Sequence, residues 1–205
     1  MIKVCGLTRL EDAQVAHDAG ADWLGFILTG ESPRRIEAAR ARAIVDALDS
    51  ALAVAVLVAP TPEQALELAT ASGARRVQLH RVDPSRWPDD FPLPAAFCVA
   101  MDEAGVLGGA LPPEPHLVML DAAHPTLAGG TGRAVPWPAA AEVARRREVL
   151  LAGGLGPDNV AEAIEVVSPF GVDASSGLES APGIKDAGKV RRFVAAARRA
   201  DAARR

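Results

Sequence analysis

The chain lacks the features that mark several common protein classes. Its 205 residues include only two cysteines, Cys5 and Cys98. Two thiols do not make a disulfide framework, and no Cys-x-x-Cys pair or His/Cys cluster predicts a zinc site. The longest apolar run, residues 51–59, is far too short to span a bilayer. The sequence therefore predicts neither a disulfide-stabilised secreted scaffold, nor a zinc module, nor a transmembrane protein.

Charge and targeting signals are also scarce. The formal net charge is −4, so we expect neither nucleic acid nor a membrane surface as a partner. Met1 leads directly into an apolar segment without a basic region or a long hydrophobic region, so no secretory signal peptide is expected and the cytoplasm is the default compartment. No Gly-x-Gly-x-x-Gly loop follows a predicted strand, so no dinucleotide cofactor is expected.

The composition is that of a globular protein, with 49% hydrophobic and 23% charged residues. Short apolar runs alternate with alanine-rich helical segments. Strands are predicted over residues 2–5, 23–28, 52–58, 76–79, 96–101, 117–120, 149–152 and 171–174. Helices are predicted over residues 10–19, 37–48, 62–71, 139–147, 158–167 and 187–200, the first of them capped by Thr8.

This alternation predicts an α/β fold, a compact (βα)8 TIM barrel that forms one domain over residues 1–205. The strands are mostly continuous apolar runs, which is typical of a parallel sheet covered on both faces. A doubly wound open sheet is the alternative, but the count of eight strands and the final strand–helix pair favour the barrel. Residues 81–115 are rich in proline and glycine, so the fourth and fifth helices are expected to be short, irregular or missing.

Polar residues occur where the predicted strands end, and in such a barrel these ends meet at one mouth. Cys5 ends the first strand, and Arg34 follows the second. Gln78 and His80 lie at the end of the fourth strand, and Asp121 follows the sixth. We expect these side chains to converge on one site.

The loops after the seventh and eighth strands are predicted to bind phosphate. Gly153 and Gly154 let backbone N–H groups approach a ligand closely. Ser175 and Ser176 add hydroxyl groups and further N–H groups. Paired loops at these positions often bind phosphate in (βα)8 enzymes, although a glycine pair alone also serves a simple turn.

These groups together offer a thiol, a carboxylic acid and a phosphate cradle, with no metal site and no cofactor expected. Such a set suits proton transfer at two places on a phosphorylated small molecule, as an isomerase requires. A thiol base needs a nearby positive field, for which Arg34 or a helix N-terminus is a candidate. Asp121 needs partial burial to hold a proton near neutral pH.

Several segments carry a resemblance to a known family. They are "KVCGLTR" at 3–9, "GADWLGFIL" at 20–28, "SPRRI" at 32–36, "VQLH" at 77–80, "MLDA" at 119–122 with "GGTG" at 129–132, "LLAGGLGPDNV" at 150–160, and "GVDASSGLESAPGIKD" at 171–186. Together they cover nearly the whole chain and resemble N-(5′-phosphoribosyl)anthranilate isomerase of tryptophan biosynthesis. The loop at 129–137 departs from the family pattern, because Pro136 stands where an acidic residue is common.

The resemblance implies a cofactor-free barrel that catalyses an Amadori rearrangement of phosphoribosylanthranilate. It implies that Cys5 is the general base at C2′ of the ribose and that Asp121 is the general acid at the ring oxygen. Arg34 is implied near the anthranilate carboxylate, with Gln78 and His80 as further substrate-binding residues. The phosphate is implied at Gly153, Gly154, Ser175 and Ser176. The expected functional form is a monomer or a homodimer.

Other interpretations stay open on the residues alone. Cys5 can be a buried small side chain, Asp121 a helix cap or a salt-bridge partner, and His80 a support for Gln78 rather than a substrate contact. Cys98 has no motif around it and is expected in the core. The rival functions are a histidine-pathway or dual-specificity sugar-phosphate isomerase and a non-catalytic phosphate-binding barrel. An aspartate is expected in place of Cys5 in the histidine-pathway enzyme.

Overall fold

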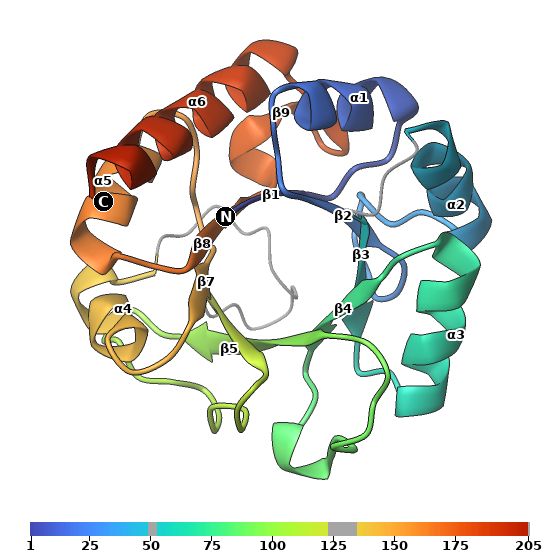
Figure 1. The fold of residues 1–205 in the computed structure, drawn as a ribbon, viewed down its shortest axis with the longest axis horizontal. Helices are drawn as coiled ribbons and strands as arrows, with labels where there is room; N and C mark the ends of the chain where they lie inside the picture. Colours follow the sequence, from blue (N-terminus) through green and yellow to red (C-terminus); the bar gives the residue numbers. More distant parts are fainter. Residues whose placement is uncertain (49–52, 123–134, 205) are drawn as a thin grey trace.

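The computed structural model describes residues 1–48, 53–122 and 135–204. Eight parallel strands close into a barrel in which neighbours follow chain order, and Figure 1 shows them inside an outer ring of helices. The strands are β1 (Ile2–Cys5), β2 (Trp23–Ile27), β3 (Ala53–Val58), β4 (Arg76–His80), β5 (Ala95–Met101), β6 (Leu117–Ala122), β7 (Val149–Leu151) and β8 (Gly171–Ala174). Because β1 pairs with both β2 and β8, the predicted barrel is confirmed and the open sheet is wrong.

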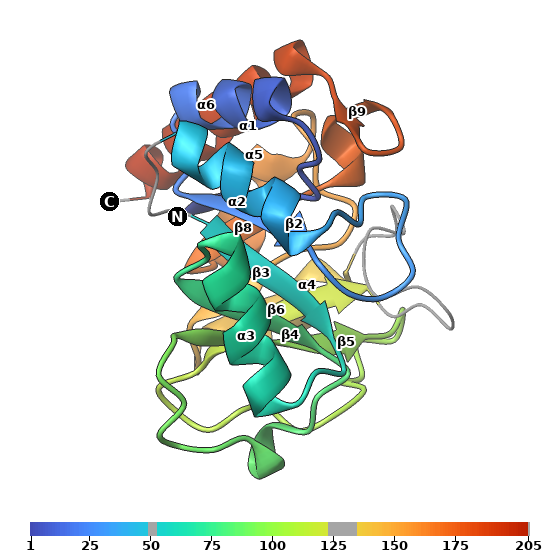
Figure 2. The same ribbon diagram turned by 90° about the vertical axis from the view of Figure 1, so that its right-hand side faces the viewer.

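All six predicted helices are present in the described residues. They are α1 (Leu10–Asp18), α2 (Ala38–Ala47), α3 (Pro62–Ser72), α4 (Trp137–Ala144), α5 (Val160–Val167) and α6 (Ala187–Ala203). In α3 the local chemistry is complete: Thr61 and Gln64 form a capping box, and the helix ends at Gly73 in the left-handed conformation. Figure 2 shows α1, α2 and α3 packed side by side on the outside of the barrel.

The prediction of short or missing helices between β4 and β6 is also confirmed. A single turn of 3-10 helix, η1 (Pro84–Arg86), follows β4, and residues 102–116, all of them described, contain no helix. The Trp87 ring contacts Phe91 and Phe97 edge-on, with ring centroids 4.9 and 5.9 Å away. These rings cover the barrel where a helix would otherwise pack.

The sequence did not predict a short segment after β8. Here η2 (Ser176–Leu178) leads into a hairpin of β9 (Glu179–Ala181) and β10 (Ile184–Lys185). The predicted cap by Thr8 is wrong, because Arg9 occupies the N-cap position of α1. The Thr8 hydroxyl instead donates a hydrogen bond of 2.6 Å to the carbonyl of Gly183 in the hairpin turn. The side chain that was predicted to cap α1 is therefore hydrogen-bonded to the hairpin instead.

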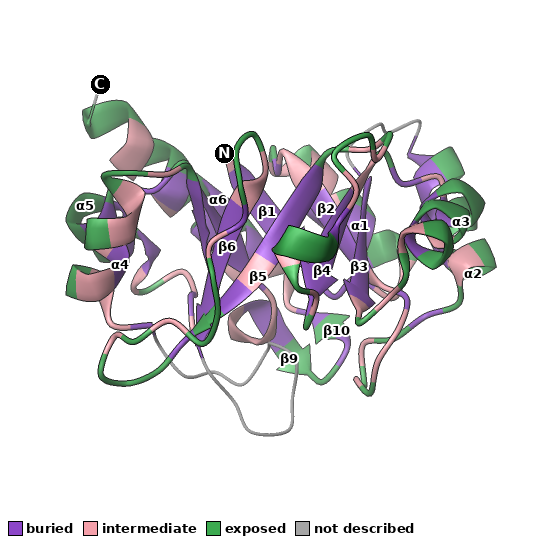
Figure 3. Cartoon of the chain, turned by 90° about the horizontal axis from the view of Figure 1, so that it is seen from below, coloured by how far each residue is buried: buried purple, intermediate pink, exposed green. Residues whose placement is uncertain are grey.

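Most strand residues are buried, as Figure 3 shows, although β5 is partly open, and the two faces of the strands differ in chemistry. The outward faces and the helices form one large apolar cluster, which includes Val4 and Phe26. The barrel interior is far more polar, because five of its buried side chains are Lys3, Gln78, His80, Asp121 and Asp173. Buried polar groups are costly unless they are paired, so their concentration here indicates a functional site. Among the described helices, none has the length and apolarity needed to cross a membrane.

Candidate active site

A cleft of about 260 Å³ opens at the carboxyl ends of the strands. The residues that line it come from seven of the eight βα units, all except that of β5. All nine predicted site residues are among them, namely Cys5, Arg34, Gln78, His80, Asp121, Gly153, Gly154, Ser175 and Ser176. The convergence predicted from the strand ends is therefore what the structure shows.

Cys5 shares its face of β1 with Lys3, since side chains two residues apart in a strand point the same way. Lys3 is fully buried, and its Nζ donates a hydrogen bond of 3.0 Å to Oδ2 of Asp173 on β8. Gly25 lies opposite Cys5 on β2. A β-carbon at that position would lie 2.8 Å from Sγ of Cys5 and 3.0 Å from Nζ of Lys3. The glycine therefore leaves the space in which the thiol and the ammonium group meet.

The environment of Cys5 pulls its pKa in two directions. Burial raises the pKa of the thiol and is the larger influence, whereas the Lys3 ammonium lowers it, Asp173 raises it again and Lys185 lowers it. Lys3 itself keeps its charge, because Asp173 and Cys5 outweigh the effect of burial and raise its pKa. The positive field at the thiol comes mainly from Lys3 and then from Lys185, neither of which was predicted. The predicted Arg34 also interacts with the charge of Cys5, but it is not among the leading influences.

Asp121 lies at the end of β6 and is 6% exposed. Burial raises the pKa of its carboxyl to about 6, although the N–H of Ala122 donates a hydrogen bond of 2.8 Å to Oδ1 and opposes the shift. With a pKa near 6, about a tenth of the carboxyl groups keep their proton at pH 7. Asp121 is thus a side chain able to donate a proton near neutral pH.

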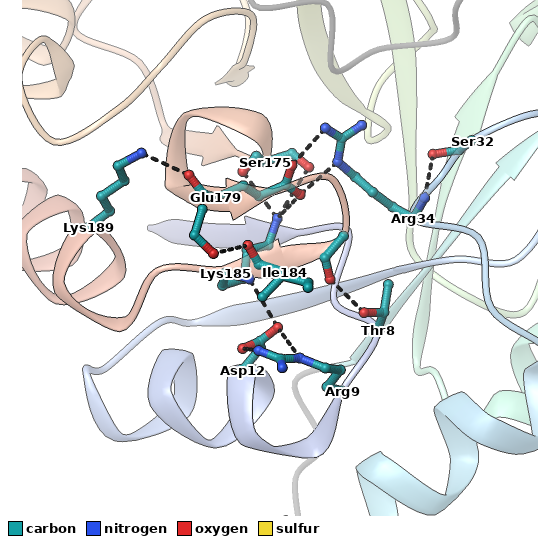
Figure 4. A network of polar contacts seen from close by, with 12 residues as sticks. Thr8, Arg9, Asp12, Ser32, Arg34, Ser175, Glu179, Ile184, Lys185 and Lys189 are labelled. Atoms are coloured by element: carbon teal, nitrogen blue, oxygen red, sulfur yellow. Dashed lines mark hydrogen bonds and ion pairs between the residues drawn. The ribbon is translucent and has the colours of Figure 1, made fainter.

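Arg34 reaches the cleft from the loop after β2, where Glu179 of β9 holds it. Its Nε and Nη2 donate to the two carboxylate oxygens of Glu179 at 2.7 and 2.8 Å. Although burial favours the neutral acid, Arg34 and Lys185 outweigh it and lower the pKa of Glu179. One edge of the guanidinium is therefore occupied, while no described residue bonds Nη1. Figure 4 shows this pair and its neighbours.

The β9–β10 hairpin connects this pair to the rest of the site, as the dashed contacts in Figure 4 show. Nζ of Lys185 donates to Glu179 at 2.9 Å and to the carbonyl of Ser175 at 3.1 Å. The backbone N–H of Lys185 donates to Asp12 of α1 at 3.0 Å. Neither Glu179 nor Lys185 was predicted as a site residue, although both lie within the quoted segment at 171–186.

Gln78 and His80 contact each other in the barrel interior, with Nε2 of one 2.9 Å from Nε2 of the other. Burial, followed by the charges of Lys3 and Arg81, lowers the pKa of His80 to about 4, so the ring is neutral. With the amide N–H donating to Nε2, the ring proton is assigned to Nδ1. His80 therefore contacts Gln78, as one of the two interpretations predicts. It also lines the cleft, and a contact with the substrate stays a prediction.

The loops after β7 and β8 have the backbone that an anion site requires. Gly153 and Gly154 adopt positive φ angles of 82° and 64°, and within the described residues no acceptor is hydrogen-bonded to their N–H groups. Asn159 braces the loop by donating to the carbonyl of Gly154 at 3.0 Å. Gly177 packs so closely on the carbonyl of Leu155 that only glycine fits. The two loops are thus in direct contact beside the cleft.

The "GGTG" segment at 129–132 lies outside the described residues. Among the residues that are described, no group of three or more histidine, cysteine, aspartate or glutamate side chains is arranged to ligate a metal ion.

Comparisons with known proteins agree on one family. The family model for N-(5′-phosphoribosyl)anthranilate isomerase matches residues 2–196. The N-(5′-phosphoribosyl)anthranilate isomerase of Rubrobacter xylanophilus is 42% identical over 202 residues, covering 96% of this chain and 98% of that protein.

Solved structures give the same result. Monomers generated from the dimeric phosphoribosylanthranilate isomerase of Thermotoga maritima superpose with a TM-score of 0.82 at 31% identity, covering 96% of this chain and 97% of that one. A phosphoribosyl anthranilate isomerase in complex with reduced 1-(o-carboxyphenylamino)-1-deoxyribulose 5-phosphate superposes with a TM-score of 0.76 at 30% identity, with the same coverage of 96% and 97%.

Proposed function

Because the chain belongs to the N-(5′-phosphoribosyl)anthranilate isomerase family, we propose that Cys5 is the base and Asp121 the acid of its reaction. The chain is an isomerase of tryptophan biosynthesis. It converts N-(5′-phosphoribosyl)anthranilate into 1-(2-carboxyphenylamino)-1-deoxyribulose 5-phosphate by an Amadori rearrangement. The observation that supports the two roles is the cleft itself, where a thiol and a carboxyl with a raised pKa share one mouth with two glycine-containing loops.

The reaction needs two proton transfers. Asp121 gives its proton to the furanose ring oxygen, the bond from this oxygen to C1′ breaks, and the anthranilate nitrogen forms a Schiff base with C1′. The Cys5 thiolate then takes the proton from C2′, and the resulting enolamine tautomerises to the ketone. Asp121 ends as a carboxylate and Cys5 as a thiol, so both must exchange a proton before the next turnover.

The remaining residues of the cleft suit the two anionic ends of the substrate. The open edge of the Arg34 guanidinium is proposed to bind the anthranilate carboxylate, since a planar fork matches that group. The N–H groups of Gly153 and Gly154, with the loop from Ser175 to Ser176, are proposed to bind the phosphate. Gln78 and His80 are proposed to contact the ribose. With its two ends fixed, the sugar lies between the acid and the base.

The roles of Cys5 and Asp121 are tested by turnover, followed as the loss of anthranilate-type fluorescence. We expect Cys5→Ser and Asp121→Asn each to lower kcat by about a thousandfold, within the range for removing a general acid or base. Asp46→Asn on the exposed face of α2 is the matched control and keeps full turnover. Full turnover by either of the first two variants contradicts the role of that residue. Comparable turnover of the histidine-pathway substrate would instead show a dual-specificity enzyme.

We also propose that the enzyme is cytoplasmic and acts as a monomer or homodimer. Both cysteines are free thiols, which agrees with a reducing compartment. The Thermotoga maritima relative is described as dimeric. Light scattering on the purified chain tests the oligomeric state, and a trimer or larger assembly would contradict it.

A further inference from the structure

We propose that Lys3 and Asp173 form a positioning pair that prepares Cys5 to lose its proton. Lys3 places a positive charge beside the developing thiolate, and Asp173 holds that charge in place. This inference rests on the proposed role of Cys5 as the base. It assigns a function to two buried residues of the barrel interior.

The geometry brings the three groups to one point. Lys3 and Cys5 share one face of β1, and both Nζ and Sγ lie within 3.0 Å of the place where a β-carbon on Gly25 would be. Asp173 on β8 accepts from the same Nζ at 3.0 Å. Main-chain pairing of β1 with β2 and with β8 fixes all three positions. The Lys3 ammonium group therefore lies between the Asp173 carboxylate and the Cys5 thiol. Strand residues alone fix its position.

The pair is costly as a purely structural element. Lys3 is completely buried, and the removal of two charges from water costs several kcal/mol for each ion. Oδ1 of Asp173 is buried and has no hydrogen-bond partner among the described residues. Two apolar side chains of similar volume would fill this space at no such cost. A buried ion pair with an unsatisfied oxygen is better explained by the chemistry of its neighbour than by stability.

Burial raises the pKa of Cys5, and the charges around the thiol oppose this effect by favouring a thiolate. Among the charged groups that act most strongly on Cys5, Lys3 and Lys185 are cations and Asp173 is an anion, so this cluster carries an excess positive charge while the thiol is protonated. When the thiol proton leaves to solvent, the thiolate balances that excess, and Lys3 keeps its three protons. Asp121 and the neutral His80 face the same cleft from β6 and β4. Arg34 and Glu179 lie beside this cluster as an ion pair, so together they leave its excess charge unchanged.

The experiment measures the thiol directly, so it does not depend on turnover. In a Cys98→Ala background, the rate of alkylation of Cys5 by iodoacetamide is recorded against pH. We expect Lys3→Met to raise the pKa of Cys5 by at least about one unit, which slows alkylation at pH 8 about tenfold. The same variant should lower kcat about tenfold with little change in KM. Lys3→Arg, which keeps the charge, should restore part of both losses.

Asp173→Asn should shift the pKa of Cys5 in the opposite direction from Lys3→Met. Removing the negative charge should lower the pKa of Cys5 and speed alkylation, a change that loss of packing alone would not produce. The double variant Lys3→Met/Asp173→Asn removes both charges and leaves no unpaired ion, so it keeps the measurement possible if Lys3→Met does not fold. Because Lys3 acts more strongly than Asp173 on the thiol, the double variant should still raise its pKa.

Lys189→Met is the matched control, because it removes the same charge from a lysine of α6 whose Nζ donates to the backbone carbonyl of Glu179. The proposal is overturned if Lys3→Met, or the double variant in its place, leaves the alkylation profile unchanged, or if Asp173→Asn raises the pKa. Full turnover by Cys5→Ser would instead refute the proposed function, whatever the alkylation shows.

Discussion

The two proposed catalytic groups, Cys5 on β1 and Asp121 on β6, have very different surroundings. Charged side chains from β8 and β10, together with Lys3 of its own strand, act on Cys5. Asp121 has burial and one backbone hydrogen bond as its leading influences. The difference follows from what burial does to each group. Burial keeps a carboxyl protonated, which is the form an acid needs, but it also keeps a thiol protonated, which is the wrong form for a base.

The acid therefore needs only an apolar pocket, whereas the base needs cations brought in from several elements. This explains why the barrel interior carries a fully buried lysine beside Cys5, and why the β6 side of the cleft needs no such partner. It also predicts that the base side is the more sensitive to small changes in packing.

Gly25→Ala should have the largest effect among changes that keep every charged residue and both proposed catalytic residues. The added β-carbon meets Sγ of Cys5 and Nζ of Lys3 at less than ordinary contact distance, so these groups must move apart. We expect kcat to fall about a hundredfold, as for other displacements of about 1 Å at a reacting centre. Gly109→Ala is the control, since nothing lies within 4 Å of its β-carbon. Near-normal turnover by Gly25→Ala would show that the base side is no more sensitive than the acid side.

The sequence could predict the groups that touch the substrate, because they follow strands at recognisable points. Cys5, Asp121 and the glycine pair Gly153–Gly154 all stand at strand ends, and the barrel brings such ends together. The eight strands and six helices could be predicted for a similar reason, since each follows from a local apolar pattern.

The contacts of the supporting residues could not be predicted, because they depend on the closed barrel. Lys3 reaches Asp173 across 170 positions of sequence, and Arg34 reaches Glu179 across 145. Strand alternation places Lys3 on the same face as Cys5, and this was the one local signal for it. The β9–β10 hairpin is too short to leave an apolar pattern of its own.

The pH dependence of kcat/KM depends on the ionisation of both Asp121 and Cys5. Below about pH 6 Asp121 is fully protonated while the thiolate fraction of Cys5 falls, so the rate should drop about tenfold for each pH unit. Between pH 6 and the raised pKa of Cys5, the loss of protonated Asp121 offsets the gain of thiolate, and the profile should be level. Above that pKa the rate should fall. Titration of the substrate phosphate by 31P NMR provides the correction for its own ionisation.

If the fall of kcat/KM at low pH began only near pH 4, burial would not raise the pKa of Asp121 as the comparison requires. Lys3→Met is the informative partner in this measurement. It should move the alkaline limb upward and leave the acid limb in place, since Lys3 is among the weaker influences on Asp121.

Glu179→Gln should have a smaller effect, because it changes how Arg34 is held without touching either proton-transfer group. The amide can accept only one of the two hydrogen bonds that now fix the guanidinium, so Arg34 loses its fixed orientation. We expect KM to rise about fivefold with kcat changed less than about twofold, as for the loss of one hydrogen bond in substrate binding. Ser180→Ala, next in β9 and exposed, serves as the control. A large fall in kcat at constant KM would show that Glu179 acts on the base Cys5 rather than on the binding of the anthranilate carboxylate.

Cys98→Ala should have the smallest effect. It sharpens the comparison because Cys98 and Cys5 are both thiols but have different surroundings. Burial raises the pKa of Cys98 well above its ordinary value, and Asp121 and Asp173 act in the same direction before the opposing effect of Lys3. A thiol in that position cannot serve as a base near neutral pH. We expect kcat to change less than about twofold and stability to fall by about 1 kcal/mol from the lost packing. In the unaltered protein, mass spectrometry after brief alkylation at pH 8 should find the label on Cys5. If the label is found mainly on Cys98, proximity to Lys3 does not distinguish the two thiols.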